Sequence, residues 1–213
     1  MGARLNGWEP TIFAEPDSDL SGTDDAQVVQ HERRLGIWWN WVACASSLLA
    51  DNPTATHILT LQDDCVLVPN ARRLMEEFIT RWPADCGLVS LYLPKRHSQD
   101  RKRRRRLPGI HPAKDKVFMG SLAVVYQRER LEKILTNRIA VRWGKSSRFP
   151  EKIIDDDICV GYCIKDMRLK LYYTFPSCSQ HISQHSTRGR GDAAAVGDRA
   201  ASWVAVDALE DCR

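Results

Sequence analysis

The stretch His57-Ile58-Leu59-Thr60-Leu61-Gln62-Asp63-Asp64 (HILTLQDD) decides how the fold is predicted. Its first five residues form an apolar run with the length and composition of a buried strand. Two carboxylates follow where that strand ends, which is the edge at which open α/β sheets bind ligands. Adjacent carboxylates suit a hard divalent cation, Mg²⁺ or Mn²⁺, which in turn binds phosphate oxygens. The alternative is an ordinary solvated turn.

Segments of strand type and helix type alternate on both sides of this stretch. The sequence predicts strands at 11–14, 57–61, 65–68, 86–93, 117–126 and 169–175, and helices at 35–49, 71–82, 128–136 and 155–167. Such alternation predicts the α/β class, with a mainly parallel sheet flanked by helices in a single domain.

The bulk composition is that of an ordinary globular chain. Of its 213 residues, 43% are hydrophobic and 27% are charged, and a chain of this length usually forms one domain. The seven cysteines are odd in number and mostly lie in apolar stretches, which favours buried thiols in a reducing compartment. Residues 1–10 lack the apolar core of a signal peptide, and no apolar stretch is long enough to span a bilayer. We therefore expect a cytoplasmic protein with no membrane partner, located in the host cytoplasm if it is encoded by a phage.

The net charge of +4 is unevenly distributed, because one short segment carries more positive charge than the whole chain nets. This segment lies in a polar, basic loop predicted at 95–116 and consists of Arg101, Lys102, Arg103, Arg104, Arg105 and Arg106. Clustered arginines attract polyanions through phosphate contacts and counterion release. The run therefore predicts nucleic-acid binding, although many such runs are only solvated loops.

Two later segments add candidate site residues. Asp155-Asp156-Asp157 opens the predicted helix at 155–167, where carboxylates offset the helix dipole. A carboxylate held near a metal is also a candidate general base for an acceptor hydroxyl. His181 and Ser186 follow the last strand and are candidates for a metal ligand and a phosphate contact, or else belong to a solvated loop with one structural histidine.

Taken in order, these segments resemble the GT-A glycosyltransferases, and most closely their bacterial and phage branch. The likeness runs through HILTLQDDCVL, GSLAVVY with RERLEKIL, DDDICVGY and FPSCSQHISQHS, and it covers most of 11–186. It implies a GT-A (Rossmann-like) domain at 1–186 and a polar C-terminal tail or closing segment at 187–213. It also implies metal-dependent transfer of a hexosyl or pentosyl group from a nucleotide sugar, with a UDP-sugar favoured, to an acceptor hydroxyl. Mn²⁺ or Mg²⁺ would bridge the diphosphate, and some phage relatives are expected to act on modified bases, so hydroxymethylated pyrimidine in phage DNA is an acceptor that the basic run fits.

The resemblance also implies roles for individual residues. Asp63, Asp64 and His181 would hold the metal, and Asp156 or Asp157 would be the catalytic base if the enzyme inverts. The residues implied on the donor side are Glu15, Asp17, Gly36, Asn40, Asp63, Gly120, Ser121 and Ser186. In two places the chain departs from the family pattern: residues 1–10 match only the tail of the first helix, so the first strand is expected to be missing, and Ser183 stands where the family has glycine.

Three rival interpretations remain open. Cys159, Cys163, Cys178 and His181 have spacing that a zinc module could use, although two of the cysteines lie on a predicted helix. The same acids and basic loop could serve a metal-dependent phosphodiesterase or nuclease. The chain could also be a non-catalytic nucleic-acid-binding module.

Overall fold

The computed structural model describes residues 7–21, 23, 26–93, 108–113, 118, 120–143 and 156–181. Its strands are β1 (Thr11–Ala14), β2 (Gln27–Gln30), β3 (His57–Leu61), β4 (Cys65–Leu67), β5 (Cys86–Ser90), β6 (Gly109–Pro112), β7 (Ala123–Gln127), β8 (Lys170–Phe175) and β9 (Ser179–His181). Its helices are α2 (Gly36–Asp51), α3 (Ala71–Ile79), α5 (Arg128–Leu135), α6 (Arg138–Arg142) and α7 (Asp156–Asp166). The α/β class is confirmed.

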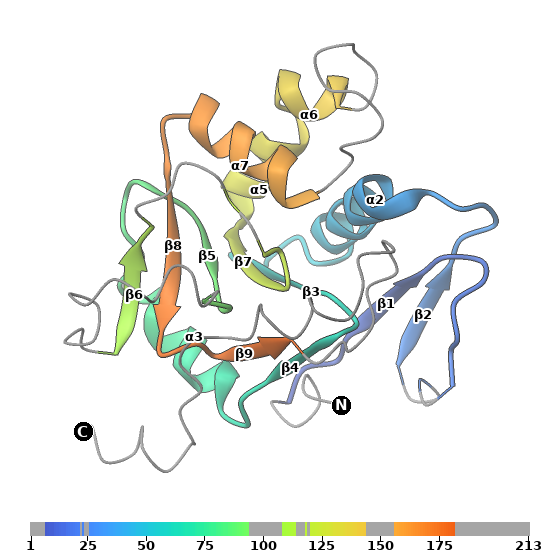
Figure 1. Cartoon of the computed structure of the whole chain (residues 1–213), viewed down its shortest axis with the longest axis horizontal. Coiled ribbons are helices and arrows are strands. Elements are labelled where there is room, and N and C mark those ends of the chain that lie inside the picture. The colour runs from blue at the N-terminus through green and yellow to red at the C-terminus, as the bar shows by residue number, and fades with distance from the viewer. Residues whose placement is uncertain are drawn as a thin grey trace, which may run out of the picture.

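The central sheet has five strands in the order β3-β7-β5-β8-β6 (Figure 1). Only β5 and β8 are paired in parallel, whereas the β3–β7, β7–β5 and β8–β6 pairs are antiparallel. The prediction of a mainly parallel sheet was therefore wrong. A continuous apolar run such as Ala123–Tyr126 indicates a strand that is buried on both faces of a sheet. It does not indicate whether that strand is parallel or antiparallel to its neighbours.

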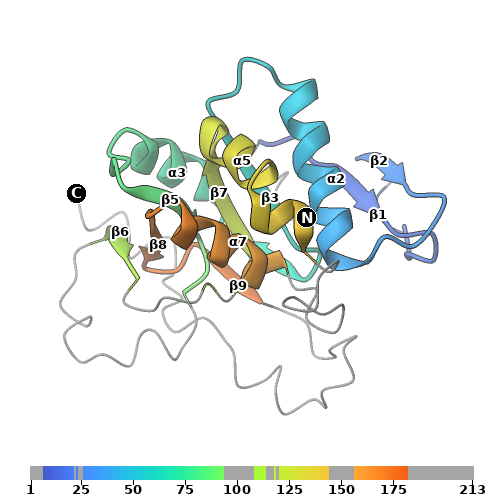
Figure 2. The ribbon, with the colours of Figure 1, turned by 90° about the horizontal axis from the view of Figure 1, so that it is seen from above.

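Two apolar layers cover the sheet, and β7 contributes to both. Val124 and Tyr126 pack into a core with α2, α5, α6 and α7, whereas Ala123 and Val125 pack against α3. This alternation is the period of two expected of a strand with two buried faces. Figures 1 and 2 show α2, α5 and α7 grouped on one side of the sheet and α3 on the other.

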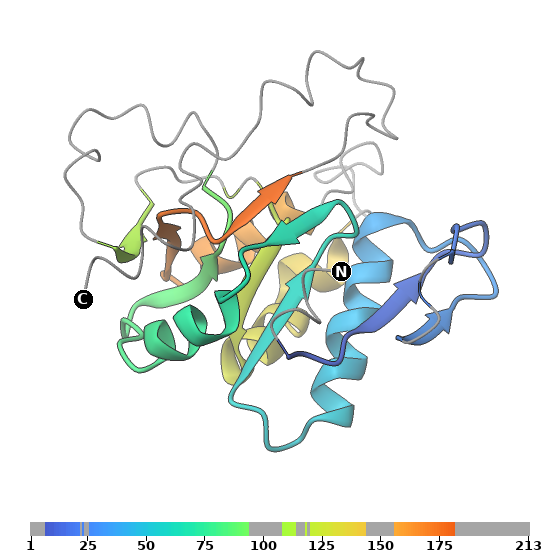
Figure 3. The ribbon, with the colours of Figure 1, turned by 90° about the horizontal axis from the view of Figure 1, so that it is seen from below.

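Two smaller strand pairs lie outside the central sheet. β1 and β2 are parallel and lie beyond α2, and β4 pairs antiparallel with β9 (Figure 3). Only three residues separate the end of β3 from the start of β4, so the β4–β9 pair lies directly beyond the Asp63-Asp64 turn.

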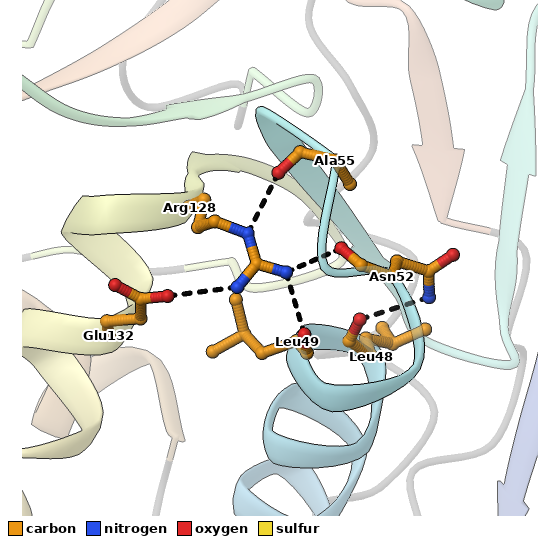
Figure 4. A network of polar contacts seen from close by, with 6 residues as sticks. All are labelled: Leu48, Leu49, Asn52, Ala55, Arg128 and Glu132. Carbon is orange, nitrogen blue, oxygen red and sulfur yellow. Dashed lines mark hydrogen bonds and ion pairs between the residues drawn. The ribbon is translucent and has the colours of Figure 1, made fainter.

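Helix α2 is held at its C-terminus by Arg128, the first residue of α5 (Figure 4). The Arg128 guanidinium donates to the carbonyls of Leu49, Asn52 and Ala55, and it pairs with Glu132 on its own helix. A cation that satisfies the last carbonyls of a helix also interacts favourably with the helix dipole. This contact joins α5 to the end of α2 and to the connection that leads from α2 to β3.

The predicted elements correspond to observed ones with shifted ends, and four short elements were not predicted. These are β2, β6, β9 and α6. Because β6 lies at 109–112 and pairs with β8, the prediction that the whole of 95–116 is a loop was wrong. None of the helices in the described ranges has the length and apolar character needed to cross a bilayer.

Candidate functional site

The turn Gln62–Asp64, here called the acid turn, connects β3 to β4. The backbone N–H of Gln62 donates to the carbonyl of Leu122 at 2.9 Å, which extends the β3–β7 pairing one residue beyond the end of β3. Asp63 is exposed and Asp64 is half-buried. The sheet therefore presents the two carboxylates at the end of β3, as the sequence predicted.

The side chain of Gln62 connects the acid turn to Ser121. Its Nε2 donates to Ser121 Oγ at 2.8 Å. Ser121 is 6% exposed, and so is buried beneath the acid turn, and Asp156, the first residue of α7, is 4% exposed.

Burial, together with the neighbouring charge of Asp157, raises the pKa of Asp156 to about 6. The nearby Ser121 hydroxyl and the backbone N–H groups of Asp156 and Asp157 act in the opposite direction, because they stabilise the ionised form. Tyr126 of β7 lies on the same face of the sheet as α7. Its phenol is fully buried, and its pKa is raised by burial and by the charge of Asp156.

Asp157 holds the segment that precedes β7. Its Oδ2 accepts a hydrogen bond from the backbone N–H of Gly120 at 3.1 Å, and its Oδ1 accepts from the N–H of Ile158 at 2.7 Å. Gly120 has φ 103, a backbone conformation that favours glycine. Unlike Asp156, Asp157 is only partly buried. The structure thus brings Asp63, Asp64, Gly120, Ser121 and the two α7 acids to one region.

The β4–β9 pairing brings the backbone of His181 to the acid turn. Cys65, the residue after Asp64, is paired with His181 in this ladder. The His181 side chain lies outside what the structure describes, as do Ser186, Asp155, the basic run at 101–106 and the tail at 187–213. The predictions made for these groups stay predictions.

Glu15, Asp17, Gly36 and Asn40 form a separate group around the start of α2. Both Glu15 carboxylate oxygens accept backbone hydrogen bonds there, from Leu35 N–H at 2.8 Å and Gly36 N–H at 2.7 Å. Asn40 contacts the carbonyl of Phe13 and the ring of His31, and Asp17 forms an exposed ion pair with Arg34. Helix α2 has no acidic residue in its own first turn. Glu15, which follows the end of β1, caps the N-terminus of this helix instead. These contacts are structural, and the predicted nucleoside contacts stay untested.

The described residues contain no group of three or more histidine, cysteine or acidic side chains arranged to hold a metal. The donors on the acid turn are two carboxylates, which are the ligand type that Mn²⁺ and Mg²⁺ prefer. The zinc interpretation loses support, because Cys159 and Cys163 pack in the core beside α2, whereas Cys178 packs on the opposite face of the sheet. Burial also raises the pKa of Cys178 to about 11, which disfavours the thiolate that zinc requires.

The contact between Gln62 and Ser121 was not predicted from the sequence. The available signal was a polar, hydrogen-bonding side chain at the end of an apolar strand, directly before two acids. Its partner Ser121 is distant in sequence, so the contact itself could not be predicted. No model of a known protein family matches this chain, and no curated protein matches it.

Proposed function

We propose that this chain is a metal-dependent glycosyltransferase that moves a sugar from a nucleotide-sugar donor to an acceptor hydroxyl. The observation that carries the proposal is that the acid turn and α7 are both bonded to the segment Gly120–Ser121: the Gln62 side chain donates to Ser121 Oγ at 2.8 Å, and the Asp157 carboxylate accepts from Gly120 N–H at 3.1 Å. This segment connects the acid turn at the end of β3 with the acids that open α7, which are the two carboxylate groups that such a reaction needs.

The acid turn is the proposed metal site. Asp63 and Asp64 would hold Mn²⁺ or Mg²⁺ through carboxylate oxygens, with His181 as the third proposed ligand. A bound divalent cation would neutralise the negative charge that develops on a diphosphate leaving group. Asp63 is exposed, so a donor diphosphate has access to its carboxylate, whereas Asp64 is half-buried and its Oδ1 is shielded from solvent.

The α7 acids are the proposed source of the general base. A base must come within hydrogen-bonding distance of the acceptor hydroxyl whose proton it removes. Asp157 is partly exposed, whereas Asp156 is 4% exposed, so Asp157 is the better candidate of the two. The N–H groups of Gly120 and Ile158 hold the Asp157 carboxylate in a fixed position.

The acceptor part of the proposal rests on charge alone. The six basic residues at 101–106 favour a polyanion, and DNA containing hydroxymethylated pyrimidine supplies both the charge and a hydroxyl.

The test is a screen of UDP- and GDP-sugars with Mn²⁺ that measures release of nucleoside diphosphate, with and without hydroxymethylated DNA. We expect turnover that requires the metal and that Asp64→Ala abolishes. Asp51→Ala is the matched control, because it removes an exposed acid at the end of α2 and should leave turnover unchanged. Absence of both turnover and donor-dependent thermal stabilisation would refute sugar transfer. Cleavage of DNA by the wild-type chain, lost in Asp64→Ala, would replace it with the nuclease interpretation.

A further inference from the structure

We draw no further inference here: the strongest candidate, the side-chain cluster of Trp38, Trp41 and Tyr126 between α2 and β7, has buried polar atoms without a hydrogen-bond partner among the described residues, and nothing in the part of the chain that the structure describes shows what would bind them.

Discussion

Replacing Asp156 with asparagine removes a buried negative charge, and we expect the variant to be more stable than the wild type at neutral pH. Asp156 is 4% exposed, and its pKa rises from 3.8 to about 6 in the folded chain. A rise of about two pKa units corresponds to about 3 kcal/mol of differential stability between the two protonation states. The neutral amide avoids this cost of ionisation, so we expect a gain of about 1–3 kcal/mol after the cost of burying the amide.

The sign of the pH dependence follows from the direction of the shift. Because the folded chain binds the Asp156 proton more tightly than the unfolded chain does, ionisation of Asp156 destabilises the fold. The destabilisation is absent below about pH 4, grows as the pH rises toward 6, and is constant above that. The advantage of Asp156→Asn should therefore be large at pH 7–8 and vanish near pH 4.

Urea unfolding at pH 4, 5, 6, 7 and 8 measures this difference directly. The control is Asp166→Asn, because hydrogen bonds and an ion pair from Arg138 and Asn137 lower the pKa of Asp166. That variant should be less stable than the wild type at neutral pH, and its disadvantage should vanish as the pH falls through the lowered pKa. A stability of Asp156→Asn equal to or below that of the wild type, with no change between pH 4 and pH 7, would refute the buried charge.

Three packing and capping contacts lead to further predictions, each measured by urea unfolding at pH 7. Gly161→Ala would place a Cβ 3.0 Å from Phe118 Cβ and 3.1 Å from its backbone nitrogen, so α7 must move and the variant should lose about 1–3 kcal/mol; an unchanged midpoint would contradict this packing. Gly87→Ala would place a Cβ 2.4 Å from Ile164 Cδ1 and should lose a similar amount, part of which Ile164→Val restores in the double variant if that atom is the obstacle. Arg128→Met removes the donor of the Leu49 and Ala55 carbonyls, and leaves Asn52 with only the N–H of Ala55, so it should lose about 2–3 kcal/mol, whereas Glu132→Gln should cost well under about 1 kcal/mol; equal losses would show that the ion pair matters more than the carbonyl contacts.

The strands of the sheet could be predicted where their residues are apolar, and not where they are polar. His57–Leu61 and Lys170–Phe175 have the composition of buried strands. The strand at Gly109–Pro112 reads GIHP and the one at Ser179–His181 reads SQH, so neither has an apolar pattern to identify it. These short strands form because a neighbouring strand offers free backbone groups, which is information that only the tertiary structure contains.

The acids of the candidate site could be predicted, but the contacts between them could not. The position of Asp63 and Asp64 after a strand is visible in the sequence. The bond from Gln62 to Ser121 depends on β7 lying antiparallel beside β3, which the prediction of a parallel sheet had missed. Glu15 shows the same limit, because its carboxylate caps a helix that begins 21 residues later in the chain.

The three acids at 155–157 have a simple explanation as favourable charges at a helix N-terminus. In the structure this explanation fits one of the two described acids and not the other. That explanation fits Asp157, whose partly exposed carboxylate accepts the N–H of Ile158 in the first turn of α7. It does not fit Asp156, because burial outweighs the backbone hydrogen bonds and raises its pKa. A carboxylate needed only for the helix dipole would be more stable if it were exposed to solvent, because an exposed charge has no desolvation cost. If Asp156→Asn is more stable than the wild type at neutral pH, then ionised Asp156 is kept at the expense of the fold, and the helix dipole alone does not account for it.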